Sequence, residues 1–134
     1  MRNLTDGTKY FQEKTIEKLT RATRKIILDA LSEVIHMSPV DTGRFRGNWQ
    51  TAIGSVPSGT IEATDPSGNI VIAKVAGVVA AMEPGDVVYM ANNLPYAQRL
   101  EDGWSQQAPA GMVRLTVQRF QPIAEAVIRQ IGAE

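Results

Sequence analysis

The sequence contains no cysteine and a single histidine, His36, among its 134 residues. Without cysteine there is no disulfide framework, no thiolate nucleophile and no cysteine-ligated zinc site. A Ser-His-Asp or Cys-His site needs a base beside a nucleophile, but His36 falls on the polar side of a predicted helix. We therefore expect no enzymatic activity, no catalytic residue, no metal and no cofactor, and we interpret His36 as a solvated residue near a helix C-terminus.

Long apolar runs are also missing. The longest one, Ile70 to Met82, is interrupted by Lys74 and is too short to cross a bilayer. The N-terminus lacks the apolar region of a secretory signal. These features predict a soluble protein that is made in a cytoplasm and has no membrane partner.

Net charge is absent as well, because 14 Lys and Arg residues balance 14 Asp and Glu residues. This balance does not favour binding to nucleic acid or to an anionic membrane. The distribution is uneven, since residues 1–50 carry nine basic and six acidic residues, whereas residues 51–134 carry five and eight. Such polarity suits head-to-tail contacts between copies, although random scatter explains these small counts equally well.

Two long helices are predicted near the ends of the chain. Apolar residues that include Ile16 and Leu19 recur at helical spacing from about Thr8 to His36. This helix should end before Pro39, because a proline disfavours helical backbone in the residue that precedes it. A similar pattern from Val113 to Ile131 predicts a C-terminal helix, which Pro122 should kink or split near Phe120.

The middle of the chain is harder to assign. Thr60 to Ala63 is predicted as a short strand and Val87 to Ala91 as a buried strand. Residues 70–82 fit either a strand or a helix, and the spacing of their valines slightly favours a helix. A short helix after Pro95 should be closed by Gly103. The predicted fold class is α+β, with a long N-terminal helix and a C-terminal helix packed on a small, mainly antiparallel sheet, in one domain of residues 1–134.

A line of positive charge follows one face of the first predicted helix. Its residues, at spacings of four, three and four, are Lys14, Lys18, Arg21 and Lys25. A solvated face opposite the apolar stripe is the simpler interpretation, because surface helices ordinarily carry such charges. A surface that faces DNA or an acidic partner is the alternative.

The segment from Pro39 to Trp49 combines turn residues with residue types that are enriched at interface hot spots. Gly43 permits the positive φ of a sharp corner. The alternative is that Phe45 and Trp49 fill the core while the arginines pair with surface acids, and the sequence favours neither interpretation. The assembly candidates in this segment are Asp41, Thr42, Arg44, Arg46 and Trp49.

A second segment, from Val87 to Ser105, joins a predicted strand to a short helix and a loop. Buried asparagines need partners, so Asn92 and Asn93 should fasten loops or cap the helix. The carboxylates of Glu101 and Asp102 are expected to be solvated and too few to hold a metal ion. The assembly candidates here are Asn92, Asn93, Tyr96, Arg99, Glu101 and Trp104, with Tyr96 better suited to the core than to a contact.

Together the two segments resemble the tail-completion family of long-tailed bacteriophages, which includes minor tail protein Z-like and related head-tail joining proteins. Members carry a proline followed by Asp-Thr-Gly-Arg, and later Asn-x-x-Pro-Tyr-Ala followed by a glutamate and a glycine. The matching residues are Pro39, Asp41 to Arg44, Asn92 or Asn93, Pro95 to Ala97, Glu101 and Gly103. Many members carry an Arg-Pro-Phe-like segment before the last helix, whereas this chain has Gln107 to Val113, which fits the Z-like branch better.

The resemblance implies a structural virion protein without enzymatic activity. Such a protein would form a homo-oligomeric ring, sixfold like the tail tube, at the head-proximal end of the tail. Its other partners would be the tail tube, the tail terminator and the connector, and genomic DNA would pass through the lumen. The expected location is the tail or neck of the virion, after assembly in the host cytoplasm.

Other functions fit parts of the same pattern. A tail terminator or a head-side stopper is also a small α+β ring protein. A nucleic-acid-binding module would use the basic line of the first helix. A hydrolase that uses His36 or Glu101 is a third hypothesis, for which no partner motif is present.

Overall fold

The computed structural model describes residues 4–133, apart from the side chains of residues 4–6 and 11. The elements, in chain order, are α1 (Leu4–Met37), α2 (Arg44–Gly47), β1 (Trp49–Ile53), α3 (Asn69–Ala80), β2 (Val88–Asn92), α4 (Ala97–Glu101), α5 (Val113–Gln118) and α6 (Phe120–Gly132). This architecture confirms the α+β class predicted from the sequence.

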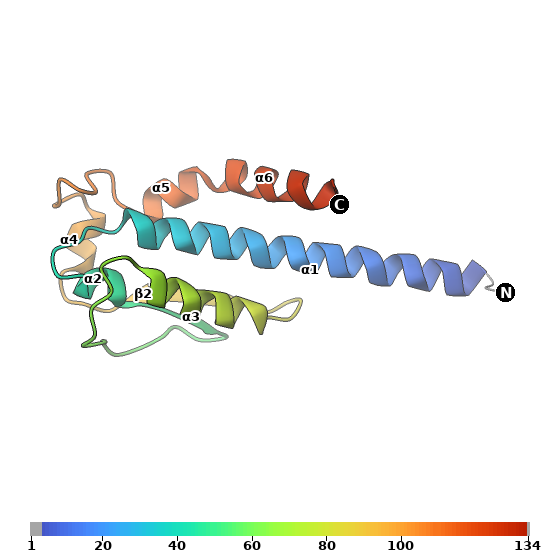
Figure 1. The fold of residues 1–134 in the computed structure, drawn as a ribbon, viewed down its shortest axis with the longest axis horizontal. Helices are drawn as coiled ribbons and strands as arrows, with labels where there is room; N and C mark the ends of the chain where they lie inside the picture. Colours follow the sequence, from blue (N-terminus) through green and yellow to red (C-terminus); the bar gives the residue numbers. More distant parts are fainter. Residues whose placement is uncertain (1–3, 134) are drawn as a thin grey trace.

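Helix α1 is the axis of an elongated molecule (Figure 1). Helix α3 packs along one side of it, and α5 and α6 pack along the other. The short helices α2 and α4 lie near the end where α1 terminates, whereas the N-terminal part of α1 extends beyond every other element. The fold therefore has a packed body and a projecting helical segment.

The two strands form one antiparallel sheet, in which Trp49 lies opposite Asn92 and Ile53 lies opposite Val88. Strand β2 begins one residue later than predicted. Its prediction as a buried strand is wrong, because its side chains are half-buried or exposed. Strand β1 was not predicted, and it is the only strand partner of β2 within residues 4–133.

The predicted strand from Thr60 to Ala63 is wrong, because these residues form an irregular segment. The backbone of Ile61 pairs with a side chain instead of a strand. Its N–H donates to Asn48 Oδ1 at 2.7 Å, and Asn48 Nδ2 donates to the Ile61 carbonyl oxygen at 2.9 Å. The buried asparagine thus replaces the neighbouring strand that the sequence pattern implied.

Helix α3 confirms the helical prediction for residues 70–82 over most of that range. Val71, Val75 and Val79 are buried at spacings of four, which forms the stripe that packs on α1. Before the helix, Gly68 has a φ of 82°, and the carboxylate of Asp65 accepts the Val71 N–H at 2.9 Å. A carboxylate in this position satisfies a free N–H of the first turn and interacts favourably with the helix dipole.

The C-terminal helix is split, as predicted. The break falls at Arg119, between α5 and α6. Pro122 therefore lies in the first turn of α6, where its missing N–H would have no helical partner. The apolar pattern continues across the break, so both helices pack against α1.

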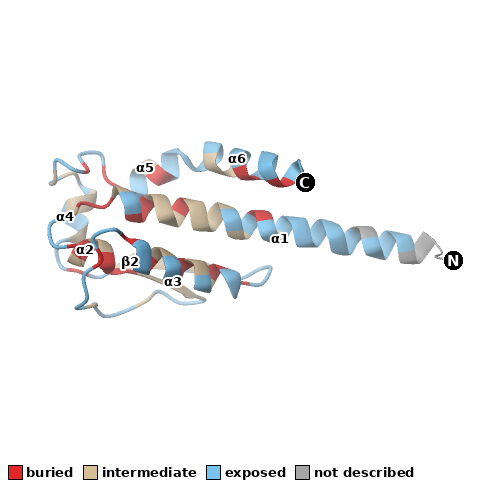
Figure 2. Cartoon of the chain, viewed as in Figure 1, coloured by how far each residue is buried: buried red, intermediate tan, exposed pale blue. Residues whose placement is uncertain are grey.

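Buried residues gather in the half of the molecule opposite the N-terminus (Figure 2). The main core joins α1, the sheet, α3 and the loop before α5, and its most buried members include Ile35, Val75 and Met112. A smaller cluster of Ala22, Val127 and Ile131 fastens α6 to α1. None of the helices within residues 4–133 has the length and apolar character needed to cross a membrane.

Candidate assembly surfaces

The turn that contains Asp41 and Thr42 is anchored to a distant loop. Gly43 has a φ of 94°, and its carbonyl oxygen accepts the Asp65 N–H at 2.9 Å. A Cβ atom at Gly43 would lie 2.6 Å from the backbone nitrogen of Pro66, so this contact requires glycine. The Thr42 hydroxyl accepts the Arg44 N–H at 3.2 Å. Asp41 and Thr42 remain exposed at this corner.

Arg46 binds backbone carbonyls within the chain. Its guanidinium donates to the carbonyl oxygens of His36 at 2.9 Å, Ser38 at 2.7 Å and Pro66 at 2.8 Å. Burial lowers the pKa of Arg46, and the negative charge of Asp65 acts in the opposite direction. A cation at these carbonyls satisfies the free end of α1 and its dipole. The side chain therefore stabilises the fold, which favours the structural interpretation of this residue over a contact role.

Trp49 belongs to the core, with 7% of its surface exposed. Its Nε1 donates to the Ser38 hydroxyl at 2.7 Å, and that hydroxyl donates to the Val34 carbonyl oxygen at 2.8 Å. The ring packs edge-on against Phe45, with the ring centroids 5.8 Å apart. Of the two interpretations that the sequence left open, the structure supports the core for both aromatic residues.

Arg44 differs from Arg46 although both lie in the same short helix. It is half-exposed, and its guanidinium lies 3.8 Å from the carboxylate of Glu62, which is almost fully exposed. Exposed ion pairs of this kind contribute little to stability. Arg44 therefore remains accessible to a partner.

The asparagines of the second segment fasten loops, which confirms their predicted role. Asn92 Nδ2 donates to the Phe45 carbonyl oxygen at 2.9 Å, and Asn92 Oδ1 accepts the Leu94 N–H at 3.3 Å. Asn93 Nδ2 donates to the carbonyl oxygens of Pro57 and Gly59 at 3.1 and 3.0 Å. Each asparagine thus binds backbone that lies far from it in the sequence.

These contacts join the two segments that were singled out from the sequence. Asn92 is bonded to Phe45, and Trp49 lies opposite Asn92 in the sheet. The ring of Phe45 also contacts the ring of Tyr96, with the centroids 6.1 Å apart. The segments therefore form one packed unit at the end of the molecule where α1 terminates (Figure 1).

Glu101 caps α5. Its carboxylate accepts the backbone N–H groups of Met112 and Val113 at 3.0 Å and that of Arg114 at 2.9 Å. Burial alone would raise the pKa of Glu101, but these three N–H groups and the charge of Arg114 lower it below its ordinary value. The expectation of a solvated carboxylate is wrong here, because the start of α5 folds over the end of α4.

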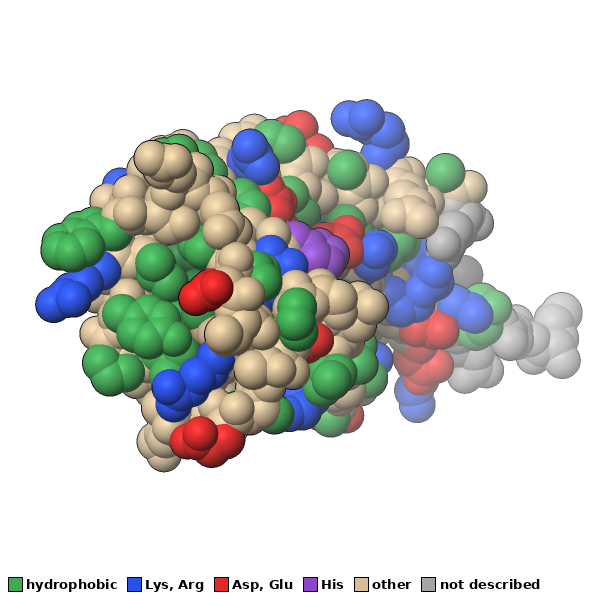
Figure 3. Space-filling view, turned by 60° about the vertical axis from the view of Figure 1, so that its left-hand side comes forward, with side chains coloured by type: hydrophobic (Ala, Val, Ile, Leu, Met, Phe, Trp, Pro, Cys, Tyr) green, Lys and Arg blue, Asp and Glu red, His purple; other side chains and the backbone are tan. Residues whose placement is uncertain are grey.

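Arg99 and Trp104 form the most accessible pair among the candidates. Trp104 is 72% exposed, and the guanidinium carbon of Arg99 lies 5.1 Å from the centre of its ring. Tyr96 is on the border of exposure, so its predicted core position is correct only in part. Figure 3, in which this end of the molecule comes forward, shows apolar side chains at the surface beside Lys and Arg side chains.

The basic line of α1 carries several compensating contacts. Lys25 pairs with Asp29 at 2.8 Å and Lys14 lies 4.0 Å from Glu17, and all four residues of the line are exposed. Arg21 and Lys25 also line a cleft of about 400 Å³ between α1, α3 and α6.

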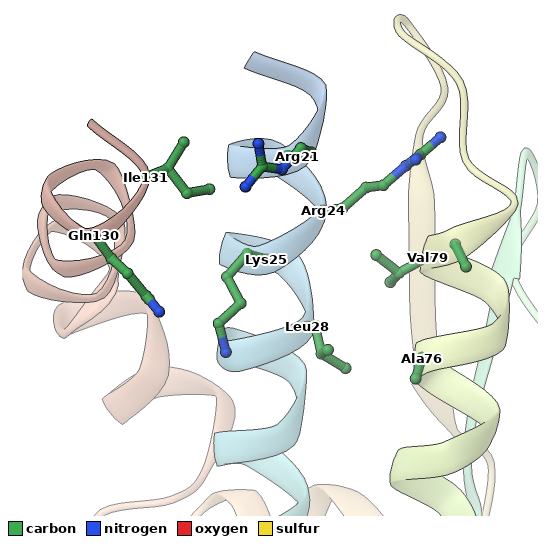
Figure 4. Close-up of a pocket in the computed structure, with 9 residues that line it drawn as sticks. Arg21, Arg24, Lys25, Leu28, Ala76, Val79, Gln130 and Ile131 are labelled. Atoms are coloured by element: carbon green, nitrogen blue, oxygen red, sulfur yellow. The ribbon is translucent and has the colours of Figure 1, made fainter. Parts of the chain in front are cut away.

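The cationic side chains of this cleft do not converge on one point (Figure 4). Arg24 turns toward the end of α3 and donates to the Met82 carbonyl oxygen at 2.6 Å, while Arg21 and Lys25 lie on the side of α6. The arrangement favours a solvated face over a single anion site.

Sequence reasoning missed the exposure of the outer part of α1. Every described side chain from residue 7 to residue 19 is exposed, including Ile16 and Leu19 (Figure 2). It also missed the amide clamp in which Gln107 bonds both backbone groups of Val40, at 2.9 and 3.1 Å. No local sequence pattern indicates either feature, because each depends on how segments far apart in the chain lie in the fold.

Within residues 4–133, no group of three or more His, Asp or Glu side chains is arranged to hold a metal ion. Comparison with known proteins finds no matching family model, no matching curated protein and no matching solved structure. The functional assignment therefore rests on the chain itself.

Proposed function

We propose that this chain is a structural subunit of a long-tailed bacteriophage that forms a ring at the head-proximal end of the tail, completes the tail and supports its joining to the head. The observation that carries the proposal is the union of the two family-like segments through Asn92 and Phe45. Residues that recur together in a family are expected to be neighbours when they specify one fold and its assembly. Here Asn92 binds a backbone group 47 residues away in the other segment.

The surface of the subunit supports an assembly role. Large apolar side chains are exposed on the outer part of α1, and the exposed Trp104 follows α4, which lies at the opposite end of the molecule (Figure 1). Exposed apolar surface that is gathered at particular places is typical of proteins that bury it against partners. The proposed partners are further copies in a sixfold ring, the tail tube, the terminator and the connector, with DNA passing through the lumen.

Deleting the gene from a phage that encodes this chain tests the proposal. We expect electron micrographs of the lysate to show filled heads and tails of normal length that are not joined. Supplying the wild-type gene in trans should restore joined particles, which controls for effects on neighbouring genes. Normal numbers of joined, infectious particles in the deletion would contradict the proposal.

The same micrographs separate this function from its closest alternatives. Tails of irregular length would indicate a tail terminator. Heads that lose their DNA after packaging would indicate a head-side stopper.

DNA binding through Lys14, Lys18, Arg21 and Lys25 is the proposal from a different class, and the exposure of Lys18 keeps it open. Contacts with phosphates would make the logarithm of the affinity fall by about 0.9 for each phosphate per tenfold rise in salt. A filter-binding titration of the wild type and of a Lys14→Gln, Lys18→Gln variant would measure this slope. The absence of salt-dependent binding by the wild type would dispose of the alternative.

A further inference from the structure

The outer part of α1, residues 7–20, is called the arm. Its residues Ile16 and Leu19 are 56% and 62% exposed. They continue the line of apolar residues that the body covers further along the same helix. That line has steps of three, seven, four and four residues and consists of Ile16, Leu19, Ile26, Ala30 and Val34. The arm thus carries the type of face that the rest of α1 buries.

An apolar groove of about 470 Å³ lies beside the inner part of the same line. Residues 27–34 of α1 form its floor, and Val88 and Met90 of β2 belong to one wall. Val113, Val117 and Phe120 of α5 and α6 belong to the other wall, and these three side chains are exposed, Val117 by 68%. The body therefore leaves this groove open, with apolar side chains on its floor and on both walls.

The arm cannot fill the groove of its own chain. Residues 16 and 27 belong to one continuous helix, and a rise of about 1.5 Å per residue separates them by roughly 16 Å along its axis. A bend of the arm toward the groove would break the helix that forms the groove floor. An arm that fills the groove must therefore come from another molecule.

A second copy supplies a segment that fits. An amphipathic helix binds an apolar groove through anchors at spacings of three and four residues, and Ile16 and Leu19 have this spacing. The distribution of charge favours contact between the arm of one copy and the body of another. The arm, residues 7–20, carries three basic and two acidic residues, whereas residues 21–134 carry ten basic and eleven acidic residues. Arm and body therefore carry net charges of opposite sign, while two arms carry like net charge.

We propose that the arm of one copy docks in the apolar groove of a second copy, with Ile16 and Leu19 as its anchors. The arm and the groove are different surfaces, so the contact repeats from copy to copy in a head-to-tail manner. The closure of such contacts into a ring rests on the proposed function. The basic line of α1 lies on the other face of the arm and stays outside the contact.

Disulfide cross-linking tests this contact, and the lack of native cysteine gives a clean background. Full-length Ile16→Cys and Val117→Cys variants, of which one carries a tag that changes its mass, are mixed and oxidised. We expect a mixed dimer on a denaturing, non-reducing gel. Lys14→Cys, two residues away on the opposite face of the arm, is the matched control and should cross-link to Val117→Cys at least about tenfold less.

A mixed dimer no more abundant than in the control would overturn the proposal. So would a predominance of Ile16→Cys dimers, because that would indicate arms paired with each other. If the cross-link forms but the deletion phage still makes joined particles, the contact stands and the proposed function fails. If particles need the protein but the cross-link is absent, the function stands and this contact fails.

Sedimentation of the unmodified protein gives a second test. The wild type should associate with rising concentration, and an Ile16→Ser, Leu19→Ser variant should associate at least about tenfold more weakly, since two anchors no longer leave water. Both side chains are exposed in the single chain, so the variant should keep its fold. Val56→Ser removes an equally exposed side chain elsewhere and should leave association unchanged. A wild type that stays monomeric at high concentration would contradict the contact.

Discussion

Side chains satisfy backbone groups at the sharp corners of this fold. Arg46 binds three carbonyl oxygens, Asn48 pairs with both backbone groups of Ile61, and Glu101 binds three N–H groups. A buried backbone group without a partner costs about 1–3 kcal/mol, so each of these side chains has a direct effect on stability. The sequence made Arg46 and Glu101 candidates for assembly contacts, whereas Asn48 was not a candidate.

Arg46 and Arg44 give a matched comparison between an arginine that binds backbone carbonyls and one that lies at the surface. Arg46→Lys keeps the charge but cannot bond the three carbonyl oxygens together, so we expect a loss of about 2 kcal/mol in the free energy of unfolding. Arg44→Lys should cost less than about 0.5 kcal/mol, because its ion pair is exposed. Urea denaturation measures both values, and equal losses would contradict the structural role of Arg46.

Glu101 should make stability depend on pH in the acid range. Its pKa in the folded state lies below its ordinary value of 4.5. Folding therefore stabilises the carboxylate form of Glu101 relative to the protonated form. Its contribution is complete above pH 4.5 and is lost as the pH falls through the folded-state pKa. Glu101→Gln should cost about 1 kcal/mol near neutral pH, comparable with the loss of a helix cap.

As the pH falls from 4.5 through the lower folded-state pKa, the difference between the wild type and Glu101→Gln should shrink, because the carboxylate becomes protonated and is then uncharged, like glutamine. Denaturation series at several pH values measure this convergence. Asp102→Asn changes the adjacent, more exposed carboxylate and serves as the control. A constant difference between the wild type and Glu101→Gln across the acid range would contradict the assigned role.

The helices were predictable because their apolar spacing is regular over several turns. The stripes of α1, of α3 and of the α5–α6 pair all have this property. The sheet was not predictable to the same extent. Strand β1 follows α2 after one residue, so its start at Trp49 coincides with the turn motif, and the partner of residues 60–63 is the side chain of Asn48. A pairing with a side chain leaves no periodic signal in the sequence.

Gly77 offers a direct test of the α3 assignment. It lies in the helix on an exposed face, and a Cβ atom there would meet no atom within 4 Å. Gly77→Ala should therefore raise the free energy of unfolding by about 0.5–1 kcal/mol, because alanine loses less backbone entropy in a helix. Thermal or urea denaturation measures the change. A loss of stability would show that these residues are not an open helical surface.

The whole molecule combines a compact body with an arm that the body does not cover (Figure 2). From the sequence, Ile16 and Leu19 were indistinguishable from the buried residues of the same stripe, because exposure depends on where α3 and α6 end. The candidate segments were found from the sequence, but only the fold separates Arg46 and Trp49, which are bound within the chain, from Arg44 and Trp104. Fewer of the candidate residues are therefore available for assembly than the motifs indicated, and Arg44 and Trp104 are among those that remain.

The composition and structure of purified phage particles test the proposed function most directly. Particles of a phage that encodes this chain would be purified, analysed by quantitative mass spectrometry and imaged by electron cryomicroscopy. We expect the chain to be present in a fixed low copy number and to form a ring between the head and the tail tube. The absence of the chain from finished, infectious particles, or its location only at the distal tip of the tail, would contradict the proposal.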